Sequence, residues 1–121
     1  MNKIVRRYLI DLARKVSVIT YQKLSDECKL NYDMKDEIDE GLMRMILFDI
    51  NIYEQYHNRP LLATLALTTN PDYSGKHIIK LADDYNILGW NKLDQIEHFQ
   101  IYHITQCIGF WCNDENYKKY Y

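Results

Sequence analysis

Hydrophobic and polar positions recur mostly at the helical period along this chain, with short β-like runs between the periodic segments. Apolar residues recur every three to four positions over residues 3–15, and a longer amphipathic segment with an acidic first turn covers residues 36–57. Thr20 is suited to cap a helix over residues 21–30, and β-branched positions precede that helix at residues 17–20. The pattern therefore predicts three helices, with a short strand before the second.

The third predicted helix is the longest. Its apolar residues at helical spacing are expected on one face: Ile38, Leu42, Met45, Ile46, Phe48, Ile50 and Tyr53. Its acidic first turn complements the helix dipole. Gly41 disfavours the helix by roughly 1 kcal/mol relative to alanine, so we expect a close contact with another helix there. Pro60 ends the helix, because the residue before a proline avoids the helical backbone.

The second half of the chain predicts a strand, a loop and further helices. Residues 61–68 are dense in Leu, Ala and Thr and predict a strand buried on both faces. Residues 70–75 have the composition of a loop. Periodicity then predicts a short helix over residues 77–86 and a last helix from residue 91 to about residue 111. Residues 113–121 form a polar and aromatic tail, which we expect to fray.

This order of elements predicts a mostly helical α+β fold, with a winged-helix-like core and additional C-terminal helices. The 121 residues fit one domain, residues 1–121, which is large enough to bury a core without disulfides. We expect the winged-helix-like core at about residues 1–80, with the loop 70–75 as its wing. The C-terminal helices take about residues 77–112 and the polar tail residues 113–121.

Composition and charge are those of an ordinary soluble protein, with 47% hydrophobic and 26% charged residues. The net charge of −2 gives no overall attraction for nucleic acid or anionic membranes. Three cysteines without paired spacing indicate reduced thiols and therefore a cytoplasmic protein. No apolar run approaches membrane-spanning length, and residues 1–10 lack the apolar centre of a signal peptide.

Candidate chemical groups are few. Glu54 and His57 share a helix face, but a carboxylate-bridged metal site needs a second such pair, which the sequence lacks. His103 and Cys107 lie four apart and would need two further ligands to hold zinc. Cys107 also lies in an apolar stretch, which opposes the low thiol pKa of a nucleophile. We therefore predict no enzymatic activity, no metal and no cofactor.

Charge is distributed unevenly along the chain. Residues 1–30 carry seven Lys or Arg and three Asp or Glu, a net +4, whereas residues 31–59 carry three against seven, a net −4. Residues 60–121 carry five against seven, which completes the total of −2. A solvated charged face is a sufficient explanation for either cluster. The acidic start of the third helix would repel phosphate, so that helix is a poor candidate for reading DNA.

Eleven tyrosines are unusual for a chain of this length. Several lie beside polar residues and are expected to be exposed: Tyr32, Tyr56, Tyr73, Tyr117, Tyr120 and Tyr121. Exposed tyrosines are enriched at interface hot spots, so together with acidic clusters they favour a basic protein partner. A tyrosine-rich composition that reflects an AT-rich genome explains their number equally well.

Two family resemblances rest on short segments. The segments are Thr20-Tyr21-x-x-Leu24, Arg59-Pro60-Leu61-Leu62-x-x-Leu65 and Leu81-Ala82. Together they resemble a family of short, largely uncharacterised bacterial proteins over roughly residues 18–88, and that family implies no catalytic assignment. The first segment is also similar to the winged-helix half of alkyltransferase-like DNA-repair proteins. Their Pro-Cys-His-Arg segment is absent, since Asn70-Pro71 leads here to Asp72-Tyr73, which removes the alkyl-acceptor chemistry.

We expect from these observations a small, non-enzymatic bacterial interaction protein of the immunity or antitoxin type. It would bind a basic protein partner, such as a nuclease. The expected partner-binding residues are Asp36, Glu37, Asp39, Glu40, Tyr32, Tyr56 and Arg59. The carboxylates would supply charge complementarity and the tyrosines would anchor the partner. Arg59 has a second interpretation, in which it only bonds carbonyl groups at the end of the third helix.

Three alternatives stay open. The first is a winged-helix nucleic-acid-binding module that uses a basic first helix, with Arg6, Arg7, Arg14 and Lys15, together with the loop 70–77. The second is an enzyme or metal-binding protein built around His57, His77 or Cys107. The third is a homodimer whose exposed aromatic residues pair with each other. None of these interpretations requires a membrane.

Overall fold

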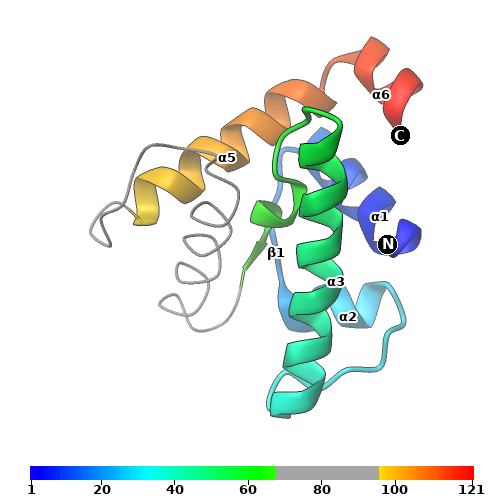
Figure 1. The fold of residues 1–121 in the computed structure, drawn as a ribbon, viewed down its shortest axis with the longest axis vertical. Helices are drawn as coiled ribbons and strands as arrows, with labels where there is room; N and C mark the ends of the chain where they lie inside the picture. The colour runs from blue at the N-terminus through cyan, green and yellow to red at the C-terminus, as the bar shows by residue number, and fades with distance from the viewer. Residues whose placement is uncertain (68–95) are drawn as a thin grey trace.

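The computed structural model describes residues 1–67 and 96–121 of the chain (Figure 1). In chain order its elements are α1 (Lys3–Arg14), β1 (Ile19–Thr20), α2 (Tyr21–Glu27), α3 (Glu37–Tyr56), the 3-10 turn η1 (Leu62–Leu65), β2 (Ala66–Leu67), α5 (Ile96–Trp111) and α6 (Asp114–Tyr120). The two short strands pair in parallel, Ile19 with Ala66 and Thr20 with Leu67. The prediction of a mostly helical α+β fold is confirmed.

Side-chain caps fix where the helices begin. Asn2 accepts a hydrogen bond from the Val5 amide before α1, and Thr20 accepts one from the Lys23 amide before α2, as predicted. Asp36 accepts from the amides of Ile38 and Asp39 and so starts α3. The predicted bounds of the first and third helices are therefore correct to about one residue.

Left-handed backbone positions lie just beyond the ends of these helices. Val16, Lys29 and Asn58 follow the C-cap residues of α1, α2 and α3 and have φ values of 54°, 56° and 58°. Because Lys29 adopts this conformation, α2 ends at Glu27, three residues before the predicted end.

The segment predicted as a strand over residues 61–68 is mostly a turn. Leu62–Leu65 form η1, and only Ala66–Leu67 pair with β1. The predicted burial is correct, because Leu61 to Ala66 are all buried. The backbone finds local partners instead of a sheet: the Ala63 amide donates to Asn51 Oδ1 at 2.8 Å, inside the core.

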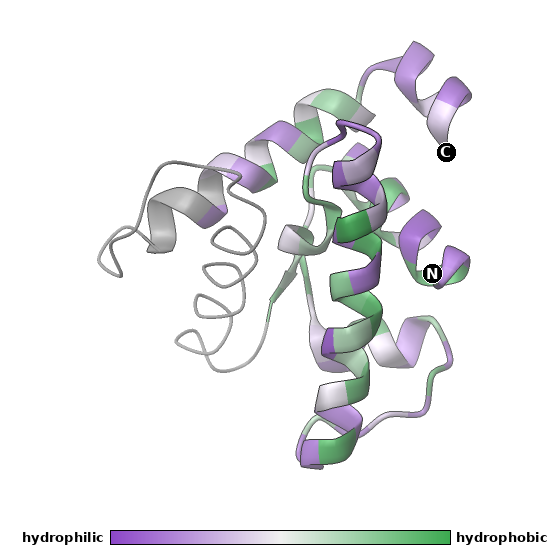
Figure 2. Cartoon of the chain, viewed as in Figure 1, coloured by the Kyte–Doolittle hydropathy of each residue, from purple (hydrophilic) through white to green (hydrophobic). Residues whose placement is uncertain are grey.

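The core forms around η1, against which α1, α3 and α5 all pack. Its largest fully buried apolar side chains come from α1, α2, α3, η1 and α5: Val5, Leu9, Ile10, Leu24, Met43, Leu47, Ile50, Leu62, Leu65 and Trp111. Figure 2 shows hydrophobic residues spread along α3 and hydrophilic residues over most of α6. The turn η1 therefore holds together helices from both ends of the chain.

The face of α3 that enters the core differs from the predicted one. The residues buried are Met43, Leu47, Ile50, Asn51 and Glu54. Of the predicted face only Ile50 is among them, whereas Ile38, Leu42 and Met45 are exposed. The helix is apolar on two sides, and the periodicity alone selected the wrong one. Among the described residues, the predicted close contact at Gly41 is not found, since a Cβ there would meet none of their atoms within 4 Å.

The C-terminal tail is a helix rather than a frayed end. Residues 114–120 form α6, which begins at an Asn113 cap. Tyr117 and Tyr121 donate their hydroxyls to Asp11 of α1 at 2.9 and 2.7 Å. The predicted wing at 70–75, the helix at 77–86 and the start of the last helix lie outside the described residues. Within the described part of the chain, no helix is long and apolar enough to cross a membrane.

Candidate functional site

A buried ion cluster joins α1 to the end of α3. Glu54 is fully buried, and its two carboxylate oxygens lie 2.5 Å from Arg6 Nε and 2.5 Å from Arg59 Nε. Arg6 also donates to the Tyr120 carbonyl at 2.7 Å. A buried carboxylate needs a counter-charge and hydrogen bonds, and the two arginines supply both to Glu54.

Aromatic rings enclose the two guanidinium groups of this cluster. The Arg59 guanidinium lies 5.3 Å from the Tyr53 ring centre and 5.2 Å from that of Tyr120. The Arg6 guanidinium lies 5.2 Å from the Tyr53 ring centre and 5.7 Å from that of Trp111. These cation–π contacts add to the ion pairs. Arg59, considered above as either a partner contact or a structural residue, lies inside this cluster.

The pair Glu54 and His57 does not converge on a metal position. Both Glu54 oxygens are taken by arginines, and His57 is exposed at the helix end, with Nδ1 2.8 Å from the Tyr53 carbonyl oxygen. Among the residues that the structure describes, no group of three or more His, Cys, Asp or Glu could hold a metal ion. His77 lies outside the described residues.

Burial determines the protonation of the other two candidate groups. Cys107 is fully buried, its thiol donates to the Leu61 carbonyl at 3.1 Å, and burial raises its pKa to about 12. It therefore stays a thiol at neutral pH and is a poor nucleophile. Burial lowers the pKa of His103 to about 4, so its imidazole is neutral at pH 7.

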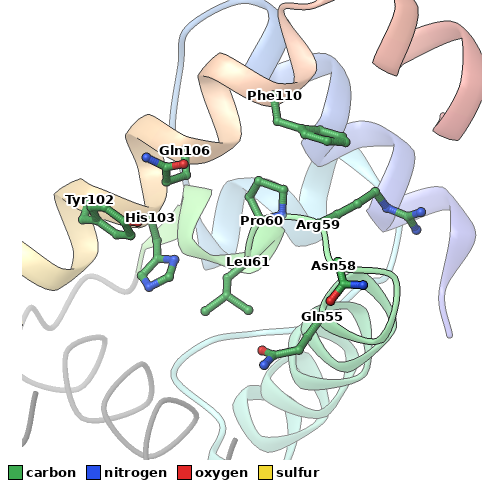
Figure 3. Close-up of a pocket in the computed structure, with 9 residues that line it drawn as sticks. All are labelled: Gln55, Asn58, Arg59, Pro60, Leu61, Tyr102, His103, Gln106 and Phe110. Atoms are coloured by element: carbon green, nitrogen blue, oxygen red, sulfur yellow. The ribbon is translucent and has the colours of Figure 1, made fainter. Parts of the chain in front are cut away.

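A pocket of about 440 Å³ lies between the end of α3 and α5 (Figure 3). It is lined by Gln55, Asn58, Arg59, Pro60, Leu61, Tyr102, His103, Gln106 and Phe110. Figure 3 shows His103 and Gln55 reaching toward Leu61 from opposite sides, while the Arg59 guanidinium turns away toward α1. The described lining residues offer side-chain amides and a neutral imidazole, which suit hydrogen bonds to a neutral polar group.

The four predicted carboxylates gather at the first turn of α3. Asp36 caps the helix, and Asp39 accepts from the Asp33 amide at 3.0 Å. Glu40 lies 3.8 Å from Arg44, and Glu37 is exposed. Two of the four are thus held in place by backbone hydrogen bonds, and all four stay near the surface.

The predicted tyrosine anchors are not equivalent. Tyr56 is 84% exposed at the end of α3, whereas Tyr32 is half-buried and packs against the core. Tyr32 is also held by its backbone, because its amide donates to Ser25 Oγ at 3.0 Å. Since α3 has 20 residues, Tyr56 lies about 30 Å along the helix from the carboxylates.

An exposed stripe on α3 links these two ends, and three of its residues, Ile38, Leu42 and Met45, were predicted on the apolar face. We call it the outer α3 stripe; it consists of Ile38, Leu42, Met45, Asp49, Ile52 and Tyr56. Ile38 is 74% exposed and Met45 64% exposed, while Ile52 is half-buried. The spacing alternates between four and three residues, which keeps all six side chains on one side of the helix. That spacing was the signal in the sequence, but it does not tell a core face from an outward one.

The four basic residues of the nucleic-acid alternative do not form one exposed patch. Arg6 is only 5% exposed, in the ion cluster. Arg14 lies 3.0 Å from Asp114 and 4.4 Å from the Tyr117 ring centre. Arg7 packs against the ring of Tyr121, and Lys15 is exposed. Most of this basic stripe is used to hold α6 against α1.

Comparison of the chain with protein-family models, with curated proteins and with solved structures gave no match. The two resemblances noted in the sequence stay predictions.

Proposed function

We propose that this chain is a protein-binding module without chemistry of its own, which holds a basic protein partner on the outer α3 stripe and the carboxylates beside it. The observation that carries the proposal is the exposure of Ile38, Met45 and Tyr56 along one side of a helix whose other side lies in the core. Contiguous exposed apolar residues with a polar rim are typical of protein interaction sites.

Charge determines the class of partner. The carboxylates of Asp36, Glu37, Asp39 and Glu40 lie at one end of the stripe, where they attract a positively charged surface and accelerate its association. Asp36 and Asp39 are already held by backbone hydrogen bonds, so little side-chain freedom is lost on binding. An immunity or antitoxin-like protein that covers a basic nuclease in a bacterial cytoplasm fits this surface.

The interior supports binding over catalysis. Cys107 has its pKa raised to about 12 by burial, and Glu54 is enclosed by two arginines. Neither group is available to a substrate. A winged-helix-like core is part of this proposal, supported by the order α1, β1, α2, α3, β2. The predicted wing at 70–75 lies outside the described residues.

A capture experiment with charge variants tests this function. The purified chain is used as bait in a lysate of its native host, with and without nuclease treatment, and retained proteins are identified by mass spectrometry. The test variant is Asp36→Asn with Glu37→Gln, Asp39→Asn and Glu40→Gln. It removes four charges, and asparagine keeps the helix cap. The control variant, Asp26→Asn with Glu27→Gln, neutralises exposed acids on α2.

The expected result is one basic protein, retained after nuclease treatment, by the wild type and the α2 control but not by the α3 variant. Its affinity should fall as salt rises, and this dependence should weaken in the α3 variant. Equal capture by both variants would refute the role of the carboxylates. Recovery of nucleic acid, with protein lost on digestion, would favour the nucleic-acid alternative.

A further inference from the structure

The outer α3 stripe has the repeat of a helix–helix interface. Its positions, 38, 42, 45, 49, 52 and 56, alternate steps of four and three residues and so follow a seven-residue repeat. A stripe with this spacing runs nearly straight along a helix of 20 residues, over about 30 Å. The surface that matches a long, narrow and straight seam of this kind is another helix with the same repeat.

The composition of α3 points the same way. A helix that is apolar on only one side belongs at the surface, whereas one that is apolar on opposite sides is normally covered on both. On α3, Met43, Leu47 and Ile50 enter the core, while Ile38 and Met45 point outward. In the described structure only the inner side is covered.

We propose that the partner presents an amphipathic helix that lies lengthwise along the outer α3 stripe, with a lysine or arginine opposite Asp49. This inference rests on the proposed function and specifies its partner. Asp49 is exposed and interrupts an otherwise apolar stripe between Met45 and Ile52. A partner that covers the stripe buries this carboxylate, and a buried carboxylate needs a cation. The partner helix also carries basic residues at the end that meets the first turn of α3.

A second copy of α3 does not supply that cation. In an antiparallel pair of α3 helices, Asp49 of each copy would meet Met45 of the other, since positions 45 and 49 are symmetric about the centre of the stripe. In a parallel pair the two Asp49 carboxylates and the two acidic first turns would face each other. The one basic residue of α3, Arg44, lies about 120° around the axis from Ile38. Charge therefore favours a different, basic partner.

Site-specific cross-linking tests the geometry. A photo-reactive phenylalanine derivative is placed at position 38, 45, 52 or 56 of the full chain, one position at a time, in host lysate. Mass spectrometry then identifies the linked residues of the partner. Under the proposal, the four positions link to one segment of one protein, at sites that progress in order with spacings of about three to seven residues.

A charge exchange tests the residue opposite Asp49. Asp49→Lys should weaken binding about tenfold or more, because two cations would then face each other. Replacing the nearest cross-linked lysine or arginine of the partner by glutamate should restore most of this loss. The matched control, Asp26→Lys on α2, should leave affinity unchanged.

The outcomes separate this inference from the proposed function. Cross-links to separate segments or to loops of one basic protein would overturn the helix geometry and leave the function standing. An unchanged affinity of Asp49→Lys would overturn the pairing at Asp49. Links only to a second copy of this chain, or no protein links from any stripe position, would overturn both.

Discussion

At the scale of single residues, Glu54 determines how the ends of the chain are held. Its buried carboxylate binds Arg6 from the first helix and Arg59 from the segment after α3, whose side chains are only 6% and 7% exposed. A glutamate near a helix end is normally predicted to lie on the surface, and its spacing from His57 indicated only a pair too small for a metal site. The structure makes it the counter-ion of two buried cations.

Removing that charge should destabilise the fold strongly. Glu54→Gln keeps the shape of the side chain but leaves two buried guanidinium groups without a counter-charge, which costs about 3–5 kcal/mol. Urea unfolding at pH 7 measures the loss. Glu37→Gln, an exposed glutamate of the same helix, should change stability by no more than about 0.5 kcal/mol. A loss below 1 kcal/mol for Glu54→Gln would mean that the cluster is dispensable.

His103 makes the stability depend on pH. Its folded pKa, about 4, lies below the ordinary 6.5 because the ring is buried, so the unfolded chain takes up its proton first as the pH falls. The contribution is complete above pH 6.5 and is lost progressively toward pH 4. Within that window each pH unit removes up to about 1.4 kcal/mol.

The measurement is urea unfolding at pH 7 and pH 5 for the wild type and for His103→Gln. Carboxylates that titrate nearby affect both proteins equally, so the difference between the two isolates the imidazole. The wild type should lose more stability than the variant over this interval. Equal losses would show that His103 is accessible to protons in the folded state.

At the scale of whole elements, alanine should stabilise the helices at the two helical glycines that the structure describes. For Gly41 in α3 and Gly109 in α5, no described residue outside the helix backbone lies within 4 Å of the position that a Cβ would take. Gly41→Ala and Gly109→Ala should therefore each stabilise the protein by up to about 1 kcal/mol, through helix propensity alone. Thermal unfolding of the single variants and of the double variant checks this, and the gains should add. A loss at either site would reveal a contact that the open space does not suggest.

The helix α6 depends on hydroxyl groups that meet one carboxylate. Tyr117 and Tyr121 both donate to Asp11, and burial together with the Tyr121–Asp11 hydrogen bond raises the pKa of Tyr121 to about 12. The double variant Tyr117→Phe with Tyr121→Phe should lose roughly 1 kcal/mol for each hydrogen bond. Faster amide exchange confined to α6 would identify the loss as undocking. Unchanged protection there would show that ring packing alone holds the helix.

The elements that could be predicted were those with local signals. Thr20 caps α2, and acidic residues occupy the first turn of α3. Both features are visible in the sequence, and the predicted starts of these two helices were correct to about one residue. The prediction of a strand over residues 61–68 was mostly wrong, because a short apolar run can be buried either as a strand or as a turn. The residue that favours the turn, Asn51, lies on α3 and accepts a hydrogen bond from the Ala63 amide. The prediction of which side of α3 enters the core was wrong for a similar reason, since both sides of the helix carry apolar residues.

The residues of the candidate site also divide into those with a local signal in the sequence and those that depend on the fold. The carboxylate cluster at the start of α3 is contiguous in the sequence and was expected there, whereas the exposed stripe needs the fold to show which side faces outward. Arg59 could not be assigned, because its partner Glu54 is also shared with Arg6, 48 residues earlier. Long-range pairs of this kind have no periodicity that a single sequence displays.

At the scale of the molecule, the three thiols differ in burial, so the rate at which a reagent modifies each one measures how far the fold must open to expose it. Cys112 is exposed, Cys28 is half-buried with its pKa raised by burial and by Glu27, and Cys107 lies in the centre of the core. An alkylating reagent should modify Cys112 first, Cys28 more slowly and Cys107 only at the rate of global unfolding. Mass spectrometry against time measures the three phases. Modification of Cys107 as fast as Cys28 would show that α5 opens on its own.

The hydrogen bond from Arg6 to the Tyr120 carbonyl spans 114 residues, nearly the whole chain. During synthesis on the ribosome, α1 emerges before α5 and α6, yet groups that complete its surroundings lie on those two later helices. The nascent chain must therefore hold an amphipathic, arginine-bearing helix without its final contacts until α5 and α6 have left the exit tunnel. Completion of this fold therefore waits until α5 and α6 are available, and α1 cannot complete its contacts as it emerges.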